Sequence, residues 1–183
     1  MLQLDFTQFP VLFTDRLILK EITPADAPAL FAMRSNPSIM KYIDRPVPQS
    51  VDDIIVLIEK MKMMKENGEG ISWGIFRKEN PDQKIGNIGF FRLIPEHYRA
   101  EIGYMLTLEA HQKGIMYEAI QKVIEYGFSS MNLHSIEANI NPENTASRKL
   151  LEKAGFVREA YFRENYYFNG RFLDSEIYSL VKG

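Results

Sequence analysis

Three segments of the chain combine residue types that can carry chemistry, and the first is a glycine loop ahead of an amphipathic stretch. Lys113 and Gly114 end the short loop 108–114, and apolar residues at helical spacing follow. A glycine at such a turn lets the unpaired N–H groups of a helix start point at one spot, where they and the helix dipole attract phosphate. The tight turn alone is an equally simple reason for Gly114, because a single glycine is a weak signal.

The second candidate is Glu101, which lies in a segment, Arg99–Thr107, whose alternation fits a buried strand. A carboxylate in such a strand is costly unless it is paired or functional. The functional interpretation is a general base whose pKa is raised by burial toward working pH. The alternative is a salt bridge to a neighbouring arginine, Arg92 or Arg99.

The third candidate is the pair Asn144 and Ser147, which fit the N-cap and third position of a helix. Capping alone would explain both residues. An aromatic run at 161–168 is more typical of strand packing than of a binding site.

The elements that must position these residues follow from hydrophobic spacing and stop signals. We predict strands at Arg16–Ile22, Ile71–Arg77, Lys84–Leu93, Arg99–Thr107, His134–Ile140, Phe156–Tyr167 and Phe172–Val181. We predict helices from Pro24 to about Arg34, from Val51 to about Asn67, over Gly114–Ser130 and over Asn144–Ala154. Asn36-Pro37 should stop the first helix, Lys78–Gln83 should be a polar hairpin loop, and Asn169-Gly170 is typical of a type I′ turn. The order β-α-α-β-β-β-α-β-α-β-β predicts one α/β (α+β) domain over 1–183, with a mixed, mostly antiparallel twisted sheet flanked by helices.

The charge balance argues against a nucleic-acid binder. Lys and Arg number 22 and Asp and Glu 24 among 183 residues, a net charge of −2, whereas phosphate-backbone binders carry a basic excess. Lys60, Lys62 and Lys65 form a small basic run, but Glu59 and Glu66 flank it, which is typical of a solvated helix face.

Several other classes are excluded by what the sequence lacks. It has no cysteine and only three scattered histidines, so we expect no metal. It has neither a P-loop nor a Rossmann fingerprint. The N-terminus has no targeting pattern and no apolar run is long enough for a membrane span, so we expect a cytoplasmic protein.

Taken together, the segments resemble the GNAT N-acetyltransferase superfamily, in particular its RimJ/RimL-like branch. The resemblance covers nearly the whole chain. Its motifs are 14–20 (TDRLILK), 100–104 (AEIGY), 113–119 (KGIMYEA), 141–147 (NPENTAS) running into 150–156 (LLEKAGF), and 169–174 (NGRFLD) with 178–180 (YSL).

This resemblance implies acetyl-CoA as donor and a primary amine as acceptor. In the family, the loop matching His111–Met116 cradles the pyrophosphate of CoA, and the strand matching Tyr104–Thr107 pairs with the pantetheine arm. The donor contacts that it implies fall on Tyr104, Met105, Leu106, Thr107, Gln112, Lys113, Gly114, Ile115, Met116, Tyr117, Asn144 and Ser147. The family pattern of this loop is Gln/Arg-x-x-Gly-x-Gly/Ala, so Gly114 is kept while His111 and Met116 depart from it.

The resemblance also implies catalytic roles for Glu101, as the base that activates the amine, and for Ser147, as a proton donor to the departing thiolate. Backbone amides of 104–106 are candidate oxyanion donors. A lysine amine with a pKa of about 10.4 costs about 4 kcal/mol to neutralise near pH 7.5, whereas an α-amine near 7.7–8.0 costs well under about 1 kcal/mol. One modest base therefore suits a protein N-terminus.

We therefore expect an acetyltransferase of protein N-termini. The alternatives are an acetyltransferase of a small-molecule amine, such as an antibiotic, polyamine or metabolite, and a non-catalytic sensor of acetyl-CoA. By the resemblance, the acceptor pocket is built from the region Pro37–Pro48 and the final strands Tyr161–Phe172. Direct contact with nucleic acid or membrane is not expected, and a second copy of the chain is kept as a candidate partner.

Overall fold

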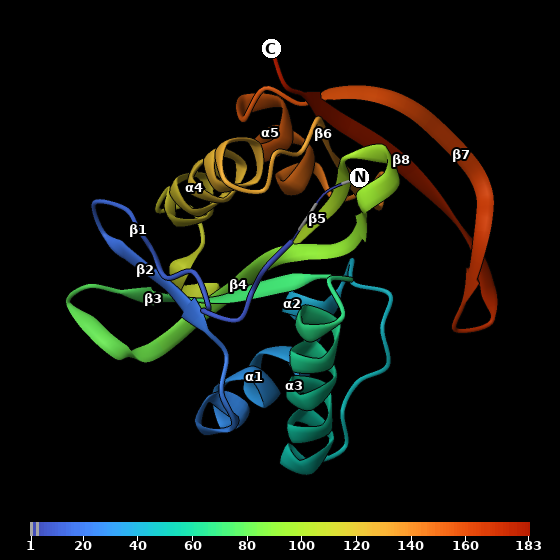
Figure 1. The fold of residues 1–183 in the computed structure, drawn as a ribbon. Helices are drawn as coiled ribbons and strands as arrows, with labels where there is room; N and C mark the ends of the chain where they lie inside the picture. The colour runs from blue at the N-terminus through green and yellow to red at the C-terminus, as the bar shows by residue number, and fades with distance from the viewer. Residues whose placement is uncertain (1, 3) are drawn as a thin grey trace.

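The computed structural model describes residues 2 and 4–183 and is built on one sheet of eight strands in the order β1-β2-β3-β4-β5-β6-β8-β7. Figure 1 shows helices α1–α3 on one side of this sheet and α4 and α5 on the other, with β7 and β8 sweeping away as a long hairpin. Among the described residues, no helix is both long and apolar enough to cross a membrane.

The elements have these bounds. The strands are β1 (Leu12–Phe13), β2 (Leu17–Glu21), β3 (Ile71–Arg77), β4 (Asn80–Ile94), β5 (Arg99–Leu106), β6 (Ser135–Ile140), β7 (Val157–Phe168) and β8 (Arg171–Val181). The helices are α1 (Ala27–Arg34), α2 (Pro37–Met40), α3 (Val51–Glu66), α4 (Ile115–Ser129) and α5 (Thr145–Lys153). Short 3₁₀ helices cover Pro24–Asp26, Pro95–His97 and Leu108–Ala110.

The predicted fold class is confirmed, with three local corrections. β1 and α2 were not predicted. Pro37 does not only stop α1, because Asn36 caps a new short helix by accepting a hydrogen bond from the Ser38 N–H at 2.9 Å. The loop predicted over Lys78–Gln83 was too long, since β4 already begins at Asn80 and register shifts at the end of β3 accommodate the irregular pairing.

Two apolar cores lie on opposite faces of the sheet. The larger core joins α4 and α5 to the sheet through residues such as Trp73, Phe90 and Ile120. The smaller core joins α1–α3 to the sheet through Leu30, Ile58 and others. The alternation predicted for β5 is confirmed, because Ala100, Ile102 and Leu106 lie in the larger core while Met105 lies in the smaller one.

Lys84 is an unexpected buried charge at the start of β4. Its side chain lies beside Gly74, where an added Cβ would stand 3.3 Å from the lysine Cε. The residue is 4% exposed, and within residues 2 and 4–183 its Nζ has no hydrogen-bond partner. Burial lowers the pKa of Lys84 from 10.5 to about 8, although Asp26 partly opposes this shift.

We predict that Lys84→Met stabilises the protein at neutral pH. Because the folded-state pKa lies below the unfolded one, the penalty is complete below pH 8 and is gone above about pH 10.5. At pH 7 the gain is about 3 kcal/mol, because one pKa unit corresponds to about 1.4 kcal/mol. Urea unfolding of both proteins across pH 7–11 measures this, with the difference shrinking as pH rises. A pH-independent difference would contradict it.

Candidate active site

The site begins where two neighbouring strands separate. β5 and β6 pair in parallel at Arg99–Ser135, Ala100–Ile136 and Glu101–Glu137 only. Beyond these pairs β5 follows β4, and β6 follows β8. The two strands therefore leave a wedge between residues 102–106 and 138–140, whose facing edges meet no other strand in the described part of the chain. An extended molecule with amide groups can pair with such an edge.

The loop before α4 ends beside this wedge and has an unusual backbone. Gln112 has φ 58° and Gly114 has φ 71°, both in the left-handed region. Within residues 2 and 4–183, the backbone N–H groups of 112–117 meet no hydrogen-bond acceptor. Unpaired amides at a helix N-terminus form a site for an anion such as a diphosphate, so the loop fits the group that the sequence predicted for it.

The two residues that depart from the family pattern do not obstruct this loop. Met116 is 8% exposed, and its side chain is part of the larger core. The His111 ring turns back to strand β5, where its Nε2 lies 3.3 Å from the Leu106 carbonyl oxygen. The loop surface is therefore left to backbone groups and to the exposed side chains of 112–114.

Arg16, which the sequence analysis did not single out, holds the loop to the β1–β2 turn. Its Nη1 donates to the Lys113 carbonyl at 3.0 Å, and its Nε pairs with Glu118 of α4 at 2.6 Å. Glu118 also accepts from the Thr14 hydroxyl at 2.5 Å. Burial works to raise the pKa of Glu118, but the bonds from Thr14 and Arg16 outweigh it and lower the pKa. Glu118 is thus held as a carboxylate.

Glu101 lies at the point of the wedge, in a group of alternating charges. Its carboxylate is 3.0 Å from the Arg92 guanidinium, and Glu137 lies 3.7 Å from the same arginine and 3.5 Å from Arg99. The salt bridge offered as an alternative for Glu101 is therefore present. Even so, burial raises the pKa of Glu101, with Arg92 opposing the shift and Glu137 adding to it. A carboxylate with a raised pKa is suited to proton transfer near neutral pH.

Ser147 of α5 and Tyr104 of β5 contact each other through their hydroxyl groups. Asn144 caps α5 as predicted, accepting a hydrogen bond from the Ser147 N–H at 3.1 Å. The Ser147 hydroxyl lies 2.7 Å from the Tyr104 hydroxyl on β5. Tyr117, at the start of α4, is covered by the Lys153 ammonium of α5, 4.2 Å from its ring centre.

Two of the other predicted contacts, Met105 and Leu106, are available through the backbone only. Met105 and Leu106 are each 7% exposed, so their side chains belong to the two cores. The Thr107 N–H is already bonded to the Ile85 carbonyl at 2.9 Å. The predicted donor contacts at Gln112, Lys113 and Ile115 lie on the loop and helix start described above. These assignments remain predictions.

Arg16, Arg77 and Lys78, which the sequence analysis did not single out, line a pocket beside the loop together with Lys113. A pocket of about 300 Å³ is lined by Asp15, Arg16, Arg77, Lys78, Glu79, Lys113 and Ile115. A neighbouring pocket of about 250 Å³ shares Arg77, Glu79 and Lys113. Both lie next to the loop and not in the wedge. Their positive charge comes from the β1–β2 turn, the end of β3 and the loop before α4, which no pattern in the sequence predicts to lie together.

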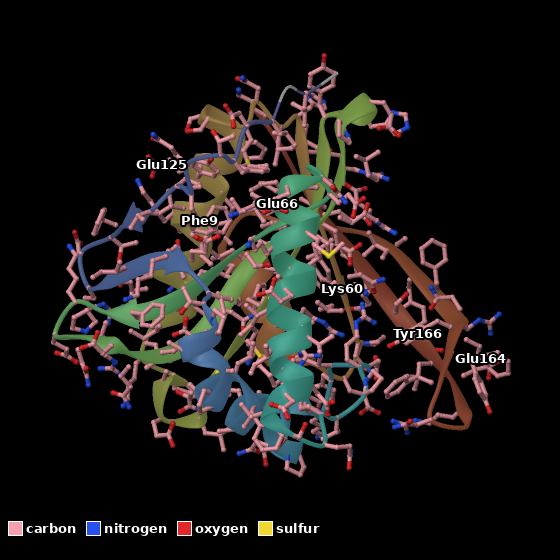
Figure 2. The ribbon with its side chains drawn as sticks, turned by 60° about the horizontal axis from the view of Figure 1, so that its bottom comes forward. Phe9, Lys60, Glu66, Glu125, Glu164 and Tyr166 are labelled. Atoms are coloured by element: carbon pink, nitrogen blue, oxygen red, sulfur yellow. The ribbon has the colours of Figure 1, made fainter. Side chains whose placement is uncertain are left out.

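The two segments predicted to form the acceptor pocket do contact each other. The Tyr166 hydroxyl of β7 donates a hydrogen bond to Asp44 in the loop between α2 and α3. Burial, followed by the Asp44 carboxylate, raises the pKa of Tyr166. Figure 2 shows Tyr166 with Glu164 on the long hairpin, across from α3. The assignment of this space to the acceptor remains a prediction.

Comparisons with known proteins show which family the chain is similar to. A family model described as an acetyltransferase (GNAT) domain matches residues 16–157. The uncharacterized N-acetyltransferase YoaA of Bacillus subtilis (strain 168) is 41% identical over 174 residues, which cover 95% of this chain and 98% of that protein. A crystal structure of an acetyltransferase (GNAT family) from Bacillus anthracis has a TM-score of 0.83 at 29% identity, covering 94% of this chain and 98% of that one.

Two further relatives carry a substrate in their names. The [Ribosomal protein uS5]-alanine N-acetyltransferase of Escherichia coli (strain K12) is 30% identical over 119 residues, covering 63% of this chain and 60% of that protein. The spermidine N(1)-acetyltransferase of Vibrio cholerae is 28% identical over 162 residues, covering 87% and 89%.

We predict that Gly114→Ala weakens coenzyme A binding by about tenfold, because the free loop would relax out of the left-handed conformation, which costs a residue with a Cβ about 1–2 kcal/mol, and would have to regain it on binding. The new Cβ would itself meet only the Arg16 guanidinium, at 3.5 Å, so the effect comes from the backbone. Titration calorimetry measures the dissociation constant. Gly68→Ala is the matched control, since Gly68 has φ 69° and open space around it, away from the loop. Equal losses of affinity in both variants would contradict the prediction.

Proposed function

The chain belongs to the GNAT acetyltransferase family, which transfers an acetyl group from acetyl-CoA to an amine, and we propose that its acceptor is a protein or peptide N-terminus activated by Glu101. The observation that carries this proposal is the position of Glu101 at the last paired residues of β5 and β6. The carboxylate thus lies where the wedge opens, beside the edge expected to hold the thioester.

The donor is proposed to lie along the wedge and the loop. The unpaired amides of 112–117 support contact with the diphosphate of CoA, with the Lys113 side chain adding positive charge. The unpaired edge of β5 supports pairing with the amide groups of the pantetheine arm. Both contacts use backbone groups, and Tyr117, Asn144 and Ser147 flank them.

The proposed reaction is direct transfer without a covalent enzyme intermediate. Glu101 accepts a proton from the amine, directly or through water, so that the nitrogen lone pair is free to attack the thioester carbonyl. The new C–N bond forms, the nitrogen gives up its surplus proton to solvent, the C–S bond breaks, and the electron pair of that bond leaves on sulfur. Ser147, on α5, is proposed to donate a hydrogen bond to the departing thiolate.

The charges around Glu101 favour an α-amine over a polyamine. Glu101 and Glu137 would attract a polycation if no cation were near them. Arg92 lies within 3.7 Å of both carboxylates, and Arg99 lies 3.5 Å from Glu137, so the two negative charges are balanced. An α-amine has a pKa of about 7.7–8.0 and needs little help to lose its proton. The uS5-alanine relative is consistent with this choice, and the spermidine relative supports a small-molecule amine as the second candidate.

We predict that Glu101→Gln lowers kcat about 100-fold, within the range of about 10²–10⁴ typical of lost acid–base catalysis. Because a base must be ionised, the wild-type rate should rise with pH through the raised pKa of Glu101, and this acidic limb should vanish in the variant. Initial rates of thiol release with a peptide acceptor across pH 5–9 test this.

Glu137→Gln is the matched control for the same experiment. It keeps Glu101 but removes the neighbouring negative charge that raises its pKa, so the acidic limb should move to lower pH without disappearing. An unchanged pH profile in Glu101→Gln would remove Glu101 as the base.

We predict that peptides with a free N-terminus are acetylated with a higher kcat/KM than spermidine or the same peptides blocked at the N-terminus but carrying lysine. Mass spectrometry locates the acetyl group and a thiol assay measures the rate. Preference for spermidine would favour the small-molecule candidate. Tight CoA binding with no thiol release from any amine would favour a sensor.

A further inference from the structure

One side-chain hydrogen bond connects strand β5 to helix α5. Tyr104 comes from β5 and Ser147 from the first turn of α5, and their hydroxyl oxygens are 2.7 Å apart. At this position β5 no longer pairs with β6. The contact therefore joins the strand proposed to hold the donor to the residue proposed to face its sulfur.

The environment of the pair fixes its geometry. Ser147 is 7% exposed, and its N–H is held by the Asn144 side chain. The Tyr104 ring packs against the larger core. Burial raises the pKa of Tyr104 to about 12, with the Ser147 contact opposing the shift, so the phenol keeps its proton at working pH.

Only one of the two hydroxyls can donate in this bond. A phenol is the stronger donor, since its pKa of about 10 lies below that of an aliphatic alcohol. When Tyr104 donates, the Ser147 oxygen acts as acceptor and its own hydrogen is free to point elsewhere. When the phenol is absent, the Ser147 hydroxyl is free to rotate among its wells.

We propose that Tyr104 is a positioning residue that orients the Ser147 hydroxyl, so that Ser147 donates a hydrogen bond to the thiolate of departing CoA. This inference rests on the proposed function. The C–S bond breaks with its electron pair on sulfur, and the O–H bond of Ser147 stays intact. No proton moves from Tyr104, because a thiol pKa of about 8.5 lies well below that of the buried phenol.

The first test uses coenzyme A alone, without an acceptor amine, and so is independent of Glu101. The ultraviolet absorbance of the thiolate gives the pKa of the CoA thiol bound to the wild type, Tyr104→Phe, Ser147→Ala and the double variant. We expect the bound thiol pKa to be lowest in the wild type and to rise by about one unit in each single variant, which is a tenfold change in thiolate stability. The double variant should match Ser147→Ala, because Tyr104 acts through Ser147.

The second test is steady-state turnover. Tyr104→Phe should lower kcat about tenfold with little change in KM for acetyl-CoA, and it should have no further effect in a Ser147→Ala background. Tyr126→Phe is the matched control, because Tyr126 is a half-buried tyrosine in the last turn of α4, packed on Trp73 at a ring distance of 5.5 Å. It should keep both the wild-type kcat and the wild-type thiol pKa.

The outcomes separate this inference from the proposed function. A wild-type thiol pKa and kcat in Tyr104→Phe, with losses in Ser147→Ala, would overturn the role of Tyr104 alone. Full additivity of the two substitutions would also overturn it, since Tyr104 would then act by another route. No change in Ser147→Ala would overturn the role of Ser147 and this inference together, while leaving Glu101 to its own pH test.

Discussion

The structure depends on a single constraint of strand pairing. Among the neighbours in this sheet, β5 and β6 form the parallel pair, whereas the other pairs are antiparallel. A parallel pair needs a crossover, and α4 supplies it. The N-terminus of α4 must then lie near the carboxyl end of β5, where the strands also separate. An anion cradle, an unpaired strand edge and Glu101 thus come together as consequences of one connection, as ligand sites do in open α/β sheets.

The charged residues around Glu101 meet two opposing requirements of a catalytic base. A base requires a pKa near working pH, but an isolated carboxylate in a partly buried strand would be costly. Arg92 reduces this cost for Glu101, and Glu137 in turn occupies Arg92 and Arg99. Because Arg92 is shared, it does not pull the pKa of Glu101 below the ordinary value, and burial remains the larger effect. The cluster therefore both tolerates the carboxylate and keeps it suited to accept a proton.

Local signals predicted local structure well. The strand Ile71–Arg77, the Asn144 cap and the Asn169-Gly170 turn, with φ 46° and 81°, are confirmed. Elements whose stability comes from distant partners were missed, such as the two-residue β1, which exists only through its pairing with β2. In the site, periodicity correctly predicted that Glu101 lies in a strand but gave no means to find Glu137 beside it on β6. The Tyr104–Ser147 bond, which spans 43 residues, carries no signal in the sequence.

The departures at His111 and Met116 show why the glycine of this loop is the informative residue. Recognition through backbone amides needs particular φ angles, whereas the side chains around the loop are free to serve other purposes. Met116 fills the core and His111 binds the Leu106 carbonyl, so neither alters the path of the chain at Gln112 and Gly114. The side chains of this loop can therefore vary without loss of the anion site, because the backbone conformation of the loop, and not its side chains, forms that site. Loss of the left-handed turn at Gly114 would remove that conformation directly.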